Sequence, residues 1–253
     1  MRFRIGSFAI VIFTRTDWLA SVDISRFYLR LAAGKGLRRV QWVQDPATYG
    51  SDAQANKSSL GRRWRQLQAV GFGLKTAPAW ASVVSAELVR IFEADGIRVL
   101  GCFIDDILIA GSSKEDCQRA LSKALRIMES LGLPANDKTE GPMSPSEGIV
   151  FLGVHVQPAH MRFTVSEEHR QYALDQISTV LKNKTATKKE LASIAGVLTW
   201  ISFVHTPGRP RCQCIYDSAR LGSAGKKSDV VSVRGPVLRQ LRWWHALVTD
   251  WVI

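Results

Sequence analysis

Two adjacent aspartates, Asp105 and Asp106, lie between two apolar runs near the middle of the chain. The runs, residues 99–104 and 107–110, are rich in β-forming residues, so the pair is expected at the tip of a tight hairpin. Carboxylates this close repel each other, and a divalent cation offsets that repulsion, because Mg²⁺ prefers one or two carboxylates together with substrate phosphates. The dipeptide alone favours the alternative, a solvent-exposed turn, since Asp is a common turn residue.

A third carboxylate favours the metal site over the exposed turn. Asp23 ends the apolar run 19–22 and is followed five positions later by the aromatic Tyr28. If the strand that ends at Asp23 neighbours the hairpin, the three carboxylates converge and can hold two ions. Such a trio is expected of nucleotidyl transfer, in which the protein mainly positions the reactants and stabilises charge on the leaving pyrophosphate.

The chain must also supply the elements that position these carboxylates. Up to about residue 156 it contains both strand-like and helix-like segments, and beyond that it is mainly helical. Helix signals include Pro78 in a first turn and Ser112-x-x-Glu115 as a capping box. The expected helices are 77–92, 114–131, 166–182, 187–204 and 235–250, with a further strand at 149–156. Residues 45–65 and 206–228, polar or rich in Pro, Gly, Arg and Lys, are expected to be connections. The pattern predicts an α+β protein with an antiparallel sheet packed on helices.

The charge of the chain favours a polyanionic partner. Its formal net charge is +12, and Lys and Arg that neutralise phosphates release condensed counterions. A hydrophobic content of 46% and a charged content of 22% exclude a disordered tail. Basic charge alone does not establish nucleic-acid binding.

The four cysteines are too few for a disulfide scaffold and indicate a reducing compartment. The apolar run at 5–13 is too short to span a bilayer, and no small-residue cleavage site follows it. The chain is therefore expected to be intracellular, in the cytoplasm or the nucleus, with no membrane partner. Cys212-Gln-Cys214 with His205 nearby suggests zinc, but the spacing matches no common ligand pattern, so zinc is the minor alternative.

Five short motifs occur in the same order as in the reverse transcriptase family, and the chain resembles that family from about residue 17 to 156. They are Asp23-Ile-Ser-Arg-Phe-Tyr28, Gly71-Phe-Gly-Leu-Lys-Thr-Ala-Pro78, Phe103-Ile-Asp-Asp106, Leu131-Gly-Leu-Pro-Ala-Asn-Asp-Lys138 and Phe151-Leu-Gly153. Each motif is weak alone, and the shared order carries the resemblance. The later helices, with Trp243-Trp244, resemble the connection in DIRS-like retrotransposons.

The resemblance implies a polymerase palm followed by a helical thumb and connection. It makes Asp23, Asp105 and Asp106 the catalytic residues and the ligands of two Mg²⁺ ions, with Mn²⁺ as an alternative. Tyr28 would lie beneath the incoming sugar and exclude a 2′-hydroxyl, whereas an ordinary core aromatic is the alternative. The implied partners are an RNA or DNA template–primer and deoxynucleoside triphosphates.

The resemblance also implies contacts to substrate and primer. Gly71 and Gly73 would let the backbone approach template or nucleotide, and a simple loop before the helix explains them equally well. Lys138 would protonate or stabilise the pyrophosphate leaving group, with a solvated surface lysine as the alternative. The hairpin that grips the primer would contain Phe151, Leu152 and Gly153.

The expected division is an unassigned segment at 1–16, a palm at 17–160, thumb-like helices at 161–205, and a linker with a connection helix at 206–253. The fingers region that precedes the first motif in complete reverse transcriptases has no counterpart, so we interpret the sequence as a fragment. The leading hypothesis is an RNA-directed DNA polymerase. The alternatives are a catalytically inactive nucleic-acid-binding remnant and an RNA-dependent RNA polymerase, against which Tyr28 argues. The sequence does not indicate an oligomeric state.

Overall fold

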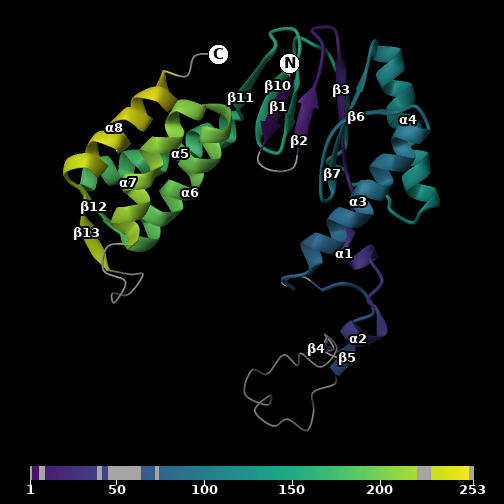
Figure 1. Cartoon of the computed structure of the whole chain (residues 1–253), viewed down its shortest axis with the longest axis horizontal. Helices are drawn as coiled ribbons and strands as arrows, with labels where there is room; N and C mark the ends of the chain where they lie inside the picture. Colours follow the sequence, from purple (N-terminus) through teal and green to yellow (C-terminus); the bar gives the residue numbers. More distant parts are fainter. Residues whose placement is uncertain are drawn as a thin grey trace. The chain divides into compact units, whose positions relative to one another are not determined.

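The computed structural model groups the chain into two compact units, which are described separately below (Figure 1). One unit is Leu19–Pro142, and the other combines Met1–Trp18 with Met143–Ile253. The structure describes residues 2–5, 9–38, 42–44, 64–71, 74–220 and 229–250. Most of the connection expected at 45–65 lies outside these residues. Helices and antiparallel strands occur in both units, as expected for the α+β class.

A four-stranded sheet forms the centre of the Leu19–Pro142 unit. Its strands, in spatial order, are β6 (Arg98–Phe103), β7 (Asp106–Gly111), β3 (Trp18–Asp23) and β8 (Glu140–Met143). Strands β6 and β7 form an antiparallel hairpin, which confirms the two strands expected on either side of the Asp pair. All residues of β7 after Asp106 are buried, because this strand lies inside the sheet.

Two helices pack against the hairpin (Figure 1). They are α3 (Ala77–Ala94), which contacts β6, and α4 (Lys114–Ser130), which contacts β7. Both confirm the helices expected at 77–92 and 114–131. The buried stripe of α3 includes Ala81, Ser85, Leu88 and Phe92, whose spacing of three to four residues places them on one helix face.

The N-cap of α4 was predicted one residue too early. Ser113, not Ser112, is the cap, and its hydroxyl accepts a hydrogen bond from the Asp116 backbone N–H at 3.2 Å. Ser113 has the extended backbone (φ −144°) that an N-cap adopts before helical dihedrals begin. Ser112 instead donates its backbone N–H to the Asp116 carboxylate at 2.9 Å, so the expected box with Glu115 is wrong.

Short elements complete this unit. They are α1 (Phe27–Arg30), α2 (Lys35–Arg38), β4 (Trp42–Gln44) and β5 (Trp64–Gln66), of which β4 and β5 pair antiparallel.

The strands of the other unit form small sheets. They are the pair β1 (Arg2–Ile5) and β2 (Ala9–Ile12), and the three-stranded sheet β11 (Arg162–Val165), β10 (Val154–Gln157) and β9 (Ile149–Phe151). The single strand expected at 149–156 is therefore wrong, because the chain turns at Leu152 and Gly153. Both residues have positive φ (52° and 76°), the conformation that two-residue hairpin turns favour.

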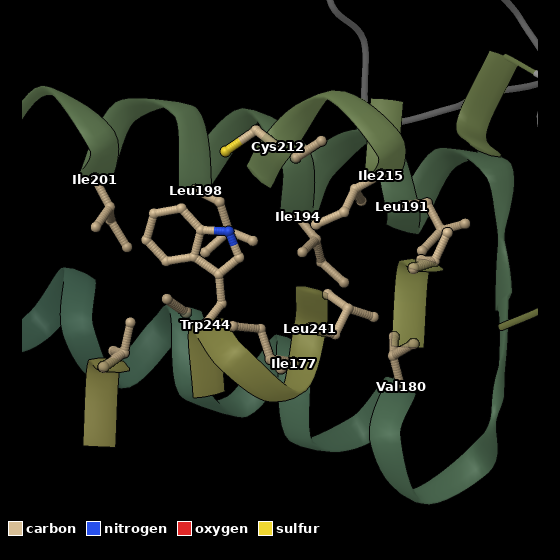
Figure 2. Packing of buried hydrophobic residues seen from close by; sticks show 14 of the residues in the cluster. Ile177, Val180, Leu191, Ile194, Leu198, Ile201, Cys212, Ile215, Leu241 and Trp244 are labelled. Carbon is tan, nitrogen blue, oxygen red and sulfur yellow. The ribbon is translucent and has the colours of Figure 1, made fainter. Parts of the chain in front are cut away.

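Four helices enclose the hydrophobic core of this unit (Figure 2). They are α5 (Glu167–Asn183), α6 (Lys188–Val204), α7 (Arg209–Arg220) and α8 (Gly235–Thr249). Strand β12 (Thr185–Thr187), between α5 and α6, pairs antiparallel with β13 (Val230–Ser232), which precedes α8. Helices α5, α6 and α8 confirm the predicted ones. Among the described residues, no helix is both long and apolar enough to cross a membrane.

Helix α7 lies where a loop or linker was expected. The prediction was wrong for this part of 206–228 because it relied on the content of Pro, Gly and Arg. Pro210 lies in the first helical turn, where proline is tolerated, and Cys212 and Ile215 are buried in the shared core. Residues 221–228 lie outside the described part of the chain.

Candidate active site

The turn that carries the Asp pair is shifted by one residue from its expected position. Phe103 pairs with Asp106 across the hairpin, so the turn residues are Ile104 and Asp105, and Asp106 begins β7. Ile104 adopts a left-handed conformation with φ of 55°. β-Branched residues are rare there, so contacts outside the turn must hold this conformation.

Asp23 ends β3, which neighbours β7 in the sheet, as the resemblance to the family implied. The backbone N–H of the next residue, Ile24, donates to the carbonyl oxygen of Asp105 at 3.0 Å. On its other side, Asp23 accepts a hydrogen bond at its carbonyl oxygen from the Asn136 backbone N–H at 2.8 Å. Backbone hydrogen bonds therefore fix the end of β3 between the hairpin turn and the segment around Asn136.

The three carboxylates influence one another electrostatically. The pKa of Asp106 is raised to about 6, mainly by burial and in addition by the charges of Asp105 and Asp23, while Lys138 opposes the rise. Burial also raises the pKa of Asp23, with Asp105 adding to the effect and Lys138 opposing it. The structure therefore brings Lys138, which is exposed, into the electrostatic neighbourhood of the carboxylates.

The carboxylates offer hard oxygen donors of the kind that Mg²⁺ takes. Asp105 and Asp23 raise the pKa of Asp106, and the positive charge of Lys138 offsets this rise only in part. In the part of the chain that the structure describes, however, no three His, Cys, Asp or Glu side chains are arranged to hold a metal ion together. The same finding covers His205, Cys212 and Cys214, the residues for which zinc was the minor alternative. Neither cysteine forms a disulfide.

The residues expected to contact the nucleotide lie on neighbouring segments of this unit. Tyr28 is half-buried in α1, with its ring centroid 6.3 Å from that of the buried Phe27. Gly71 follows Val70, whose backbone N–H donates to the Leu31 carbonyl just after α1 at 2.9 Å. Gly73 lies outside the described residues.

The expected primer-grip residues form the tip of the β9–β10 hairpin in the other unit. Phe151 is buried at the end of β9, and Leu152 and Gly153 form the turn. The Gly153 carbonyl accepts a hydrogen bond from the Ser166 backbone N–H at 2.9 Å, which joins the turn to the start of α5.

Two aromatic side chains pack directly on this turn. The His169 ring of α5 stacks on Trp200 of α6 with centroids 4.7 Å apart. A Cβ atom on Gly153 would lie 2.9 Å from His169 Cε1 and 3.0 Å from Trp200 Cζ2. Glycine is therefore required for close approach as well as for its positive φ, and the turn is docked onto α5 and α6.

Sequence reasoning missed the residues that support the site from behind. Ser85 of α3 contacts the Ile104 carbonyl, and Asn136 contacts both the backbone and the carboxylate of Asp23. His169 and Trp200 support the β9–β10 turn. The available signal for Ser85 was a lone hydroxyl on the apolar stripe of a helix.

Comparison with known proteins agrees with this geometry. The model of the family described as "Reverse transcriptase (RNA-dependent DNA polymerase)" matches residues 10–156. A solved structure titled "Structure of the foamy viral protease-reverse transcriptase in complex with RNA/DNA hybrid" has the same fold, with a TM-score of 0.64 at 15% identity. The similarity covers 95% of this chain but only 28% of that chain. A search of curated proteins found no match.

The polymerase fold expected from the sequence is thus confirmed by the structural similarity. The family match spans more than half of the chain and includes Asp23, the Asp105-Asp106 pair and the β9–β10 turn. This chain belongs to the reverse transcriptase (RNA-dependent DNA polymerase) family.

Proposed function

We propose that this chain carries the catalytic palm of an RNA-directed DNA polymerase. Asp23, Asp105 and Asp106 would hold two Mg²⁺ ions, for which Mn²⁺ can substitute. The observation that carries the proposal is the hydrogen bond from Ile24 to the Asp105 carbonyl, which joins the end of β3 to the Asp turn. Family membership supports the same assignment, since reverse transcriptases generally use divalent metal ions.

The chemistry proposed for the site follows from its charges. When bound, the ions would activate the primer 3′-hydroxyl and neutralise charge that develops on the triphosphate. The raised pKa of Asp106 supports this role, because a cluster of negative charge gains most from a divalent cation. The Nζ ammonium of Lys138, close enough to lower the pKa of both Asp23 and Asp106, would donate its proton to the departing pyrophosphate.

The family and the charge support the proposed substrates. A template–primer of RNA or DNA suits a chain with a net charge of +12, and Tyr28 would select deoxynucleotides by excluding a 2′-hydroxyl. We propose that α5 and α6 act as the thumb and that the β9–β10 turn, docked between them, contacts the primer. The contacts of Gly153 with Ser166, His169 and Trp200 support this proposal, because they attach the turn to both helices.

A catalytically inactive nucleic-acid-binding remnant is the second candidate. One observation favours it: among the described residues, no three acidic, His or Cys side chains are arranged to hold a metal ion. The basic charge would then serve binding alone.

Primer extension separates these candidates. The wild type, Asp105→Asn and the control Asp175→Asn, an exposed Asp on α5, would be assayed on poly(rA)–oligo(dT) with Mg²⁺ and either dTTP or UTP. We expect incorporation to fall about 100-fold or more in Asp105→Asn and to persist in Asp175→Asn. Equal incorporation by wild type and Asp105→Asn would remove the assigned site. Salt-sensitive binding by an inactive wild type supports the remnant, and preference for ribonucleotides supports an RNA polymerase.

A further inference from the structure

Ser85 is a buried hydroxyl on the face of α3 that packs against the hairpin. Its relative exposure is 2%, and its neighbours on the stripe, Ala81 and Leu88, are apolar. A buried polar group is unfavourable unless it is hydrogen-bonded, and alanine would satisfy the helix and the core equally well. The hydroxyl must therefore find its partner nearby.

Two carbonyl oxygens lie within reach of the Ser85 hydroxyl. One belongs to Ala81 in the same helix, at 2.8 Å, and the other belongs to Ile104 in the Asp turn. Because a hydroxyl has a single proton, the two carbonyls compete for it.

The turn is held at two successive carbonyls by two different elements. The Ile104 carbonyl contacts Ser85 of α3, and the Asp105 carbonyl accepts from the Ile24 N–H at the end of β3. The Cα atom of Asp105, which bears the carboxylate side chain, lies between these two carbonyl groups. Ile104 is in the left-handed region with φ of 55°, which a β-branched residue adopts only when its surroundings impose it.

We propose that Ser85 is a positioning residue for the Asp105-Asp106 pair, acting through its hydrogen bond to the Ile104 carbonyl. Without this bond the turn is free to relax toward an ordinary backbone conformation, which redirects the peptide next to Asp105. The inference rests on the proposed function, since it assigns Ser85 to the support of the same carboxylates.

The chain provides a matched control on the same helix. Ser82 Oγ donates to the Pro78 carbonyl at 2.8 Å, the same bond to the residue four positions earlier, but Ser82 is exposed. Ser82→Ala therefore removes an equivalent helix contact from the solvent face of α3. Ser85→Thr retains a hydroxyl at the buried position.

The test compares the full chain with Ser85→Ala, Ser85→Thr and Ser82→Ala by two measurements. The first is hydrogen exchange of the backbone amides of residues 103–107, which needs no activity. The second is primer extension at increasing Mg²⁺. For Ser85→Ala we expect exchange in the turn to accelerate about tenfold or more with the rest of the chain unchanged. We also expect kcat to fall about 10- to 100-fold, with a higher Mg²⁺ midpoint and an unchanged KM for template–primer. Ser85→Thr should recover part of each, and Ser82→Ala should resemble the wild type.

Three other outcomes have defined meanings. Unchanged exchange at 103–107 in Ser85→Ala overturns the inference whatever the activity. Exchange that rises equally throughout the chain also overturns it, because Ser85 would then serve general stability. Faster exchange confined to the turn, in a protein whose wild type incorporates no nucleotide, supports the anchoring contact and rejects the proposed polymerase function.

Discussion

The backbone N–H of Ile24 donates a hydrogen bond to the carbonyl oxygen of Asp105 across a distance of 3.0 Å. Ile24 directly follows the candidate metal ligand Asp23, and Asp105 is itself a candidate ligand. This main-chain contact therefore fixes the separation between Asp23 and the hairpin turn. Side-chain ion pairs play no part in this contact. The carboxylates can therefore lie close together despite their repulsion, because the backbone of the sheet holds them there.

The raised pKa of Asp106 predicts that this carboxylate weakens the metal-free fold. With a folded-state pKa of about 6 against an ordinary value of 3.8, its charge disfavours folding above about pH 6, and the penalty disappears as pH falls toward 4. Asp106→Asn should then stabilise the protein at pH 8 by about 1 kcal/mol, allowing for solvent screening of a partly exposed group. This corresponds to a rise in Tm of about 2–4 °C.

Thermal unfolding in EDTA at pH 8 and pH 4 measures this difference. The gain in Asp106→Asn should be present at pH 8 and much smaller at pH 4, where the wild-type carboxyl is protonated in the folded state and close to half-protonated in the unfolded state. A variant that is less stable than the wild type at pH 8 contradicts the prediction. The same variant should lose primer extension, since a neutral amide does not supply the negative charge with which a carboxylate binds Mg²⁺.

A second prediction concerns Mg²⁺ in the absence of substrate. Binding to the folded state alone raises Tm by mass action, and a proton on Asp106 competes with the ion. Because the pKa of Asp106 is about 6, the rise in Tm with added Mg²⁺ should be larger at pH 7.5 than at pH 5. Titrations of Tm at both values would be compared with Asp105→Asn. Shifts of the same size at both pH values, or in both proteins, rule out binding at the carboxylates.

Local signals explain what could be predicted from the sequence. The strands around the Asp pair and the helix with Pro78 in its first turn follow from nearby residue types, which is why they were placed correctly. The one-residue shift of the turn could not be found this way. It depends on Ile104 in a left-handed conformation, held by Ser85 and Ile24, which are distant in sequence.

Helix α7 shows the same limit in the other unit. Its composition is that of a loop, and it forms because Cys212 and Ile215 are buried with residues of α6 and α8 (Figure 2). The adjacency of Asp23 to the hairpin was expected only through the resemblance to a family. No local pattern in the sequence reports which strands become neighbours in a sheet.

The β9–β10 turn predicts a strong effect of Gly153→Ala. The new Cβ would meet His169 and Trp200 at about their present positions, 2.9 and 3.0 Å away, and the residue would keep a φ of 76°. Gly235→Ala in the same unit is the control, since its φ is 54° and nothing lies within 4 Å of the added Cβ. Both variants carry backbone strain of about 1–2 kcal/mol, and only Gly153→Ala adds about 1–3 kcal/mol from overpacking. Denaturant unfolding measures both values, and equal losses would show that the contact with the two rings is dispensable.

The close packing of Gly208 against Trp244 in the core of the helical unit gives a prediction about stability. A Cβ on Gly208 would lie 2.1 Å from Trp244 Cη2, although Gly208 is not in the left-handed region. Trp244 is fully buried, and its Nε1 has no hydrogen-bond partner among the described residues, so Trp244→Phe removes packing but no hydrogen bond. Gly208→Ala should cost about 1–3 kcal/mol or more by overpacking, and Trp244→Phe should cost a similar amount through a cavity.

The double variant should be more stable than the sum of the single losses predicts, because the smaller ring leaves room for the added methyl. A double-mutant cycle by urea unfolding measures this coupling, which we expect to be about 1 kcal/mol or more in the favourable direction. Losses that simply add would show that Gly208 and Trp244 relax independently and that their close contact does not determine how the residues before α7 pack on α8.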